Sequence, residues 1–282
     1  MSTTLLSVAQ LSACLEDRNL RVFDCRHDLR NPDYGTQAYA RGHIPGAQFL
    51  HLDRDLSGTT NGSNGRHPLP ERKVFAATLS RYGVCADTQV VAYDNEGGIF
   101  AARLWWMLRW MGHFRVAVLN GGLAAWKMAK LPLSQEAPVP AAADFQMRPG
   151  DRPLNAEDVL ANLDSARMLL LDARDPDRFS GAKETLDPVG GHIPGAINRF
   201  FADNLDENGI YFKPAAELST DYSAILNGRD PGSVVQTCGS GVTACHNLLA
   251  METAGLQGSR LYPGSWSEWC ADPTRPIAQG DS

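Results

Sequence analysis

Short apolar runs alternate with amphipathic stretches along the whole chain. Runs of β-branched and other apolar residues predict buried strands, and apolar residues spaced three and four apart predict helices. The predicted strands are 21–24, 90–93, 116–119, 169–172, 234–237 and 260–262, and the predicted helices are 7–15, 74–82, 101–111, 156–163 and 243–252. Strands interleaved with helices favour an α/β fold, in which a mostly parallel sheet is flanked by helices.

Four landmarks recur in the same order in the two halves of the chain. Each half has an apolar run ending in Asp-x-Arg, an identical Gly-His-Ile-Pro-Gly-Ala segment, a strand followed by a glycine-containing stretch, and a tryptophan-containing segment. The matching residues of the two halves include Asp24 and Asp172, Gly42 and Gly191, Asp94 and Cys238, and Trp126 and Trp269. This order indicates a duplicated domain rather than a short-period solenoid.

Proline and alanine without periodicity dominate the stretch between the copies, which is typical of a linker. The expected organisation is a first domain over residues 1–135, a linker over 136–150 and a second domain over 151–282.

The residues that follow Tyr93 and Thr237 are candidates for a site, because ligands of parallel sheets bind beyond the carboxyl ends of the strands. In the second copy Cys238 begins the run Cys-Gly-Ser-Gly-Val-Thr. Gly239 and Gly241 allow backbone N–H groups to converge into an anion-binding nest. The helix start adds further N–H groups, and Thr243 is placed to cap it. A cysteine facing such a nest is expected to exist substantially as thiolate, and the nest would also hold a persulfide anion.

The alternative for Cys238 is a small buried cysteine beside a tight turn, which is how most cysteines are used. The first copy has Asp94 at the corresponding position. A carboxylate cannot act as a thiol nucleophile, so we expect the first domain to be inactive and the second to carry the chemistry.

The chain resembles the rhodanese family of tandem-domain sulfurtransferases over nearly all of its length. The run from Cys238 to Ala244 is similar to the active loop of 3-mercaptopyruvate sulfurtransferases, whereas thiosulfate-specific relatives typically carry Arg-Lys where this chain has Gly239-Ser240. The resemblance implies two rhodanese-like domains, the second catalytic. It also implies transfer of sulfur from 3-mercaptopyruvate to a thiol, cyanide or thioredoxin acceptor through a Cys238 persulfide, without a cofactor.

The charge of the loop bears on the donor. Thiosulfate is a dianion that two cations would suit, and 3-mercaptopyruvate carries one carboxylate that an arginine can hold. The run from Cys238 to Thr243 contains no cation, which favours mercaptopyruvate. Thiosulfate is the alternative donor.

The resemblance also implies roles for other residues. Arg178 would bind the donor carboxylate, and Gly239, Ser240, Gly241, Val242 and Thr243 would form the binding loop. The alternative for Arg178 is a surface ion pair with Asp175 or Asp177. Relatives usually have a second arginine where this chain has Asp187; Lys183 lies nearby, and this departure leaves thiosulfate open.

The family further implies that a histidine and an aspartate join Ser240 in handling a proton, and His43 and Asp33 are the candidates. The alternative is a structural His43, because His192 occupies the same turn of the second copy. Asp24 and Asp172 occur in both copies, which favours a structural role at the strand ends.

Two other functions are compatible with a cysteine at a strand end. A cysteine-dependent phosphatase would need an arginine to close its loop, and no Arg or Lys occurs between Cys238 and Leu249. A non-catalytic sulfur carrier cannot be separated from an enzyme by sequence. No metal site is expected, since Cys245 and His246 diverge by about 100° on a helix.

Composition narrows the setting. Of 282 residues, 43% are hydrophobic and 21% charged, which is typical of a soluble globular protein. No apolar run is long enough to cross a bilayer, and the formal net charge of -6 disfavours nucleic-acid and anionic-membrane partners. An anionic donor would need local cations. No secretory signal pattern is visible, so we expect a cytoplasmic protein with reduced cysteines.

Overall fold

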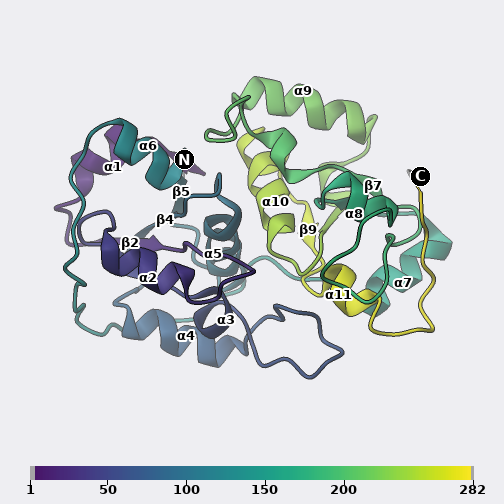
Figure 1. Ribbon diagram of the computed structural model, residues 1–282, viewed down its shortest axis with the longest axis horizontal. Coiled ribbons are helices and arrows are strands. Elements are labelled where there is room, and N and C mark those ends of the chain that lie inside the picture. Colours follow the sequence, from purple (N-terminus) through teal and green to yellow (C-terminus); the bar gives the residue numbers. More distant parts are fainter. Residues whose placement is uncertain (1–3, 281–282) are drawn as a thin grey trace. The chain divides into compact units, whose positions relative to one another are not determined.

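The computed structural model describes residues 4–280. Contacts divide the chain into two compact units (Figure 1). The first unit comprises the chain up to Gly58, Leu69–Asp151 and Asp206–Phe212, and the second comprises Thr59–Pro68, Arg152–Leu205 and the chain from Lys213 onward. The main change of unit lies close to residue 150, where the sequence places the end of its linker.

The first unit is built on a five-stranded sheet, counted over the described residues, in which every pairing is parallel. Its order is β1-β5-β4-β2-β3. The strands are β1 (Leu5–Leu6), β2 (Leu20–Asp24), β3 (Gln48–Phe49), β4 (Gln89–Tyr93) and β5 (Val116–Leu119). The helices are α1 (Val8–Cys14), α2 (Tyr34–Arg41), α3 (Leu52–Asp55), α4 (Arg72–Arg81), α5 (Ile99–Trp110) and α6 (Gly122–Met128).

Helices flank this sheet and bury its apolar side chains. Leu11 of α1 and Trp126 of α6 pack with Val22, Val91 and Leu119 of the strands in one core. Helix α5 packs against β4 and β5. Strands buried in this way explain the nearly continuous apolar runs in the sequence.

Residues 136–150, expected to be a linker, belong to the first unit. Phe145 is buried, and its N–H donates to Ser80 Oγ of α4 at 3.1 Å. The N–H of Arg148 donates to the carbonyl of Met111. The segment therefore has no regular secondary structure, and hydrogen bonds to the helical part of this unit hold it in place.

The second unit has a four-stranded sheet over the described residues, again with parallel pairings, in the order β7-β6-β8-β9. The strands are β6 (Leu169–Asp172), β7 (Ile197–Asn198), β8 (Val234–Thr237) and β9 (Arg260–Leu261). The helices are α7 (Ala156–Ser165), α8 (Pro176–Ser180), α9 (Ala215–Leu226), α10 (Thr243–Thr253) and α11 (Ser265–Trp269), with short 3₁₀ turns η1 (Phe201–Asn204) and η2 (Pro231–Ser233).

One core of the second unit joins α7 and α11 to the sheet. Val159, Trp266 and Trp269 pack with Leu170 and Val235 of the central strands. Helix α10 packs against β8, β9 and α9, and Figure 1 shows α9 and α10 lying side by side. The prediction that the tryptophans serve packing is confirmed for Trp126, Trp266 and Trp269, which are 0% exposed.

The α/β fold class and the main predicted elements are confirmed, with ends that shift by up to two residues. Helix α1 begins where the sequence suggests, because Ser7 and Gln10 form a capping box. The two-residue strands β1, β3 and β7 are absent from the sequence-based prediction, since two residues carry no periodicity.

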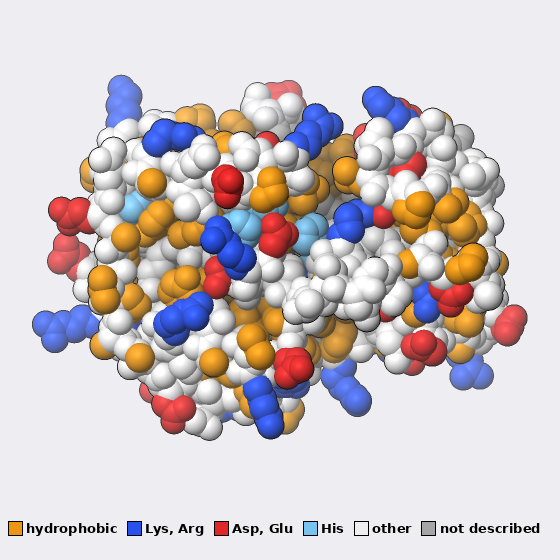
Figure 2. Space-filling model, turned by 60° about the horizontal axis from the view of Figure 1, so that its bottom comes forward, with side chains coloured by type: hydrophobic (Ala, Val, Ile, Leu, Met, Phe, Trp, Pro, Cys, Tyr) orange, Lys and Arg blue, Asp and Glu red, His pale blue; other side chains and the backbone are white. Residues whose placement is uncertain are grey.

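The described residues contain no helix long and apolar enough to span a bilayer. On the face drawn in Figure 2, acidic and basic side chains are interspersed rather than gathered into one-sign patches.

Candidate active site

Cys238 follows the last residue of β8 directly, and a loop leads from it into α10. The residue is only 1% exposed, and its Sγ accepts a hydrogen bond from the N–H of Gly241 at 3.1 Å. The Cys238 N–H donates to Ser265 Oγ at 3.1 Å. The loop therefore aims a backbone N–H at the sulfur, as an anion-binding nest does.

Gly241 allows the loop to close. Its φ is +74°, and a Cβ there would lie 2.3 Å from the carbonyl oxygen of Pro263. The N–H groups of Trp266 and Ser267 donate to the carbonyls of Cys238 and Gly239 at 2.9 Å. Hydrogen bonds from residues at the start of α11 thus hold the loop in place. Only glycine fits at position 241, because of its positive φ and the nearby Pro263 carbonyl.

Val242, not Thr243, occupies the N-cap of α10, and the prediction that Thr243 caps the helix is wrong. Val242 has φ -90° and ψ -64° and makes no side-chain cap bond. A capping side chain needs an extended backbone so that it can turn back to the N–H groups. The chain has already entered the helical region at Val242, so Thr243 is the first residue inside the helix.

Ser240 has a histidine partner within the second unit. Its Oγ lies 2.7 Å from Nδ1 of His67, and both residues are buried. Either atom can donate, depending on the tautomer of the imidazole. A hydroxyl and an imidazole at this distance can pass a proton between them.

His67 and Arg66 belong to the segment 59–68, which is part of the second unit although it precedes the first unit's α4 in sequence. Asn61 shapes this segment, because its Oδ1 accepts hydrogen bonds from the N–H groups of Ser63 and Asn64. The N–H of Arg66 donates to Ser267 Oγ at 3.1 Å and ties the segment to α11.

His43 is not the partner of Ser240. Its Nδ1 lies 2.9 Å from the carbonyl of Tyr39 and its Nε2 lies 3.1 Å from that of Glu136, so both ring nitrogens face backbone oxygens. Its ring stacks on Tyr39, as that of His192 stacks on Phe179 in the second copy. The histidine of the repeated turn is held by backbone carbonyls in both units, and the histidine that bonds Ser240 is His67 rather than His43.

Asp33 is exposed at the N-cap of α2, where its side chain makes no capping hydrogen bond. Asp33 and His43 belong to the first unit, where both ring nitrogens of His43 face backbone carbonyls, and Ser240 is bonded to His67 within the second unit.

Two arginines approach the loop at Gly239. A Cβ on Gly239 would lie 2.8 Å from Nη2 of Arg66 and 3.4 Å from Nη1 of Arg178. Their side chains are 29% and 20% exposed. The second guanidinium beside the loop is thus Arg66, and Lys183 is an exposed residue. The loop carries no cation of its own, but the fold supplies two.

Both arginines are paired with buried carboxylates. Arg178 bonds both oxygens of Glu184 and also Asp187, the latter at 3.1 Å. Arg66 forms an ion pair with Asp187 as well. The alternative for Arg178, a pair with Asp175 or Asp177, is replaced by these partners.

The two carboxyl groups differ in acidity. Burial raises the pKa of Asp187, and repulsion by Glu184 adds to this, although Arg66 and Arg178 oppose it. Burial acts in the same direction on Glu184, but N–H bonds from Leu186 and the Arg178 guanidinium hold its pKa below the usual value. Asp187 therefore loses its charge at a higher pH than an ordinary aspartate, whereas Glu184 keeps its charge to a lower pH than an ordinary glutamate.

The Asp-x-Arg landmarks form a structural network, as their duplication suggested. Asp172 accepts a hydrogen bond from Arg174 at 2.7 Å, and the same arginine donates to the carbonyl of Gly191 at 2.7 Å. Arg174 also lies over the ring of Trp266, 4.9 Å from its centroid. In the first unit Asp24, Arg26 and Gly42 make the equivalent contacts. In each unit the network links the Asp-x-Arg run at the end of a strand to the Gly-His-Ile-Pro-Gly-Ala turn.

The first unit fills its corresponding loop with a carboxylate. Asp94 is 0% exposed. Burial raises its pKa, although bonds from backbone N–H groups oppose this. The donors are Glu96, Gly98, Phe100 and Ala101. A loop of this kind therefore converges on an anionic group, and in the first unit that group is a fixed side chain.

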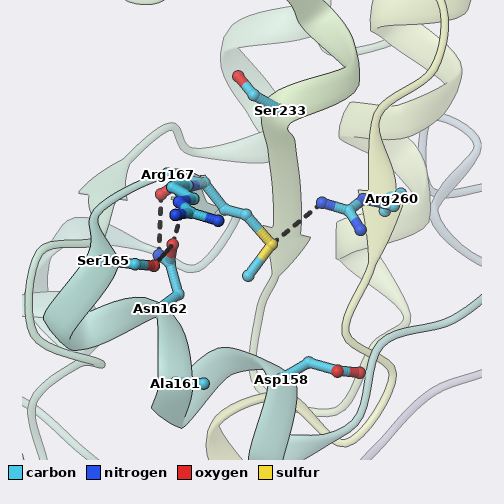
Figure 3. Close-up of a pocket in the computed structure, with 8 residues that line it drawn as sticks. Asp158, Ala161, Asn162, Ser165, Arg167, Ser233 and Arg260 are labelled. Carbon is cyan, nitrogen blue, oxygen red and sulfur yellow. Dashed lines mark hydrogen bonds between the residues drawn. The ribbon is translucent and has the colours of Figure 1, made fainter.

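Two further features lie outside the loop. His27, His51 and Asp53 place potential ligand atoms within 4.8 Å of one another, but both nitrogens of His51 are already bonded, to the N–H of Asp53 and the carbonyl of Pro32. A hollow of about 340 Å³ beside α7 contains none of the loop residues (Figure 3). There Asn162 bonds both the N–H and the carbonyl of Met168, which closes the turn after α7.

Arg66 and His67 were missed by the sequence analysis. They lie in a stretch rich in Asn, Gly and Thr that has no periodicity. A histidine and an arginine adjacent in such a loop are a weak signal, because loops often carry functional residues.

Comparisons with known proteins agree with this geometry. The model of the rhodanese-like domain matches residues 7–129 and 155–272. A Pseudomonas aeruginosa protein named as a probable 3-mercaptopyruvate sulfurtransferase is 48% identical over 99% of both chains. The thiosulfate sulfurtransferase of Rattus norvegicus is 35% identical over 94% of this chain and 90% of its own.

The fold also matches solved structures. The 3-mercaptopyruvate sulfurtransferase from Leishmania major superposes with a TM-score of 0.84 at 30% identity, covering 95% of this chain and 74% of that one. Family model, sequence relatives and structure agree over both units, and the chain belongs to the rhodanese family of two-domain sulfurtransferases.

Proposed function

We propose that the protein transfers sulfur from 3-mercaptopyruvate to a thiol or cyanide acceptor through a persulfide on Cys238. The observation that carries this is the Cys238 Sγ held on the Gly241 N–H, in a loop whose Ser240 is bonded to His67. The names of the relatives support the reaction class.

The first half-reaction forms the persulfide. The Cys238 thiolate attacks the sulfur of the donor, a new S–S bond forms, and the C–S bond of mercaptopyruvate breaks. The electron pair of that bond passes to the carbon as the enolate of pyruvate, which takes up a proton. The donor thiol also carries a proton, and the Ser240 Oγ and His67 Nδ1 pair is placed to move it.

The second half-reaction returns the enzyme to its starting state. The acceptor nucleophile attacks the outer sulfur of the persulfide, and the S–S bond breaks with its electron pair returning to Cys238. Cyanide gives thiocyanate, and a thiol gives a new persulfide. The backbone N–H groups of the loop stabilise the anionic sulfur in both halves.

Arg66 and Arg178 would receive the anionic end of the donor, because their guanidinium groups flank Gly239. This also keeps thiosulfate as a second candidate donor. Two arginines beside the loop suit a dianion, and one relative is a thiosulfate sulfurtransferase. With thiosulfate the bond that breaks is S–S, and sulfite leaves.

Mass spectrometry tests the proposal. Protein treated with either donor, without acceptor, should gain the mass of one sulfur atom on the peptide that contains Cys238. Cys238→Ser should gain none. Steady-state kcat/KM for the two donors then ranks them. If the wild type never gains sulfur at Cys238, the proposal is wrong.

Two other functions have distinct outcomes in the same experiments. A carrier without turnover would gain sulfur at Cys238 but show negligible kcat with both donors. A phosphatase would hydrolyse a chromogenic phosphate ester and lose that activity in Cys238→Ser. The sulfurtransferase relatives favour neither of these functions.

A further inference from the structure

The residue at issue is Asp187, which lies between the two arginines that reach the active-site loop. Its carboxylate pairs with Arg66 through one oxygen and with Arg178 through the other. The Asp187 side chain is 3% exposed, so these partners replace most of its water. A donor anion that binds the same guanidinium groups meets a competing negative charge already in place.

The charges of this cluster cancel. Arg66 and Arg178 are positive, and Glu184 and Asp187 are negative, so the group that faces Gly239 is neutral overall. Behind it Arg174 is matched by Asp172. A donor that approaches the Cys238 thiolate therefore finds directed N–H donors but no net positive charge.

Such a site distinguishes donors by charge. Mercaptopyruvate brings one negative charge and can share a guanidinium bidentately through its carboxylate. Thiosulfate carries two negative charges, and the cluster has no cation without a paired carboxylate to balance the second charge. The electrostatic repulsion between Asp187 and the donor is therefore greater for the dianion than for the monoanion.

From this geometry we infer that Asp187 is a specificity-determining residue, which favours a monoanionic donor over dianionic thiosulfate by neutralising Arg66 and Arg178. The inference rests on the proposed function, since it concerns the choice of donor at the same site. Asp187 has no role in bond making or breaking.

The alternative role for Asp187 is purely structural, as a brace that holds the two arginines in place. The two roles give different results. A brace, when removed, lowers the efficiency of both donors together. If instead the charge of Asp187 selects the donor, its removal changes the ratio of the kcat/KM values for the two donors.

The test is the ratio of kcat/KM for thiosulfate to kcat/KM for mercaptopyruvate. Asp187→Asn keeps the shape and removes the charge, and it should raise this ratio about tenfold, which corresponds to about 1.4 kcal/mol. The gain should appear mainly as a lower KM for thiosulfate. Both arginines are partly exposed, so water can solvate the released charge and the variant should fold.

Arg66→Gln provides an independent test of opposite sign. It removes a cation from the cluster and should lower the ratio by a similar factor. The Arg66→Gln result is used as the test if a thermal melt shows that Asp187→Asn is unfolded.

Asp203→Asn is the matched control for net charge, because it removes one exposed acidic group of the same unit that pairs with Arg199. Its ratio should stay within about twofold of the wild type. A ratio in Asp187→Asn that is unchanged, lower, or matched by Asp203→Asn overturns the inference. Failure of the proposed function looks different, since the wild type itself would then transfer sulfur from neither donor.

Discussion

Two residues at equivalent positions, Cys238 and Asp94, show how one kind of loop is used in two ways. In the first unit the backbone N–H groups of the loop donate to the Asp94 carboxylate. In the second unit the Gly241 N–H meets the Cys238 sulfur instead. In the proposed function, a cysteine in place of the fixed carboxylate makes the second loop the reactive one.

The proton relay gives a prediction at this scale. Mercaptopyruvate carries an S–H proton and thiosulfate does not. Ser240→Ala and His67→Gln should therefore lower kcat/KM for mercaptopyruvate by about 100-fold, the usual scale of general acid–base assistance, and that for thiosulfate by much less. Initial rates with both donors measure this. An equal loss with both donors would assign the Ser240–His67 pair to holding the loop in shape.

His43→Gln is the comparison variant for this prediction. The structure bonds the His43 ring to backbone carbonyls within the first unit. Its effect should appear as a lower melting temperature rather than as a change in the ratio of donors.

Acid should act on Asp187 in the same direction as Asp187→Asn. The pKa of Asp187 is raised by burial, so its charge is lost at a higher pH than that of an ordinary aspartate, while the pKa of Glu184 is lowered. As the pH is lowered, the thiosulfate preference of the wild type should rise toward that of Asp187→Asn, starting at a higher pH than an ordinary aspartate would give.

The variant serves as the baseline in this pH series, because any titration other than that of Asp187 affects both proteins. The measured quantity is the wild-type ratio of kcat/KM values divided by that of Asp187→Asn at each pH. A quotient that stays constant with pH would contradict the charge explanation.

At the scale of elements, the site depends on how β8, its loop and α11 are joined. The carbonyls of Cys238 and Gly239 accept bonds from α11 residues, and Gly241 passes close to Pro263. Arg174 links the end of β6 to the turn at Gly191 and lies over Trp266 of α11. The loop is thus held by neighbours on several sides, which preorganises its N–H groups before a donor arrives.

Gly241→Ala tests this dependence. A Cβ would lie 2.3 Å from the Pro263 carbonyl in a backbone with φ +74°, so the loop must shift. We expect a loss of about 3 kcal/mol in the free energy of unfolding and loss of most activity. Urea denaturation and donor assays measure the two effects.

Gly255→Ala is the matched control, because Gly255 has φ +80° and nothing within 4 Å of its would-be Cβ. It carries the left-handed backbone cost of about 1 kcal/mol without the clash. Equal effects of the two substitutions would show that the close approach to Pro263 is unimportant.

At the scale of the whole molecule, the chain crosses between its units more than once. Residues 59–68 leave the first unit to join the second and bring Arg66 and His67 with them. The candidate site is therefore not built from one continuous stretch of sequence. The formal net charge of -6 offers no attraction for an anionic donor, so its binding has to depend on directed N–H donors of the loop and of the two arginines.

At this scale we predict that each chain takes up one sulfur atom from the donor. The loop of the first unit is filled by Asp94, and Cys25 of the same unit is 1% exposed with a pKa that burial raises well above its usual value. Donor-treated protein should gain one sulfur in intact-mass spectra, and Cys238→Ser none. A second added sulfur that survives in Cys238→Ser would contradict the assignment of a single reactive unit.

The sequence by itself determined the parts whose signals are local. Apolar runs predict the buried strands, the repeated landmarks predict two copies, and Cys238 followed by Gly239 and Gly241 predicts an anion-binding loop at a strand end. Each depends on neighbours in the chain, through strand burial or backbone freedom, so each can be read without coordinates.

Only the tertiary structure decided which side chains meet that loop. His43 was a candidate because of the family resemblance, yet its repeated turn is structural, and the histidine that bonds Ser240 is His67 of the segment 59–68. Arg66 replaces a cation expected near Asp187 from a position more than a hundred residues away in the chain. Side-chain contacts between distant segments depend on packing of whole elements, and no periodicity or spacing in one sequence encodes them.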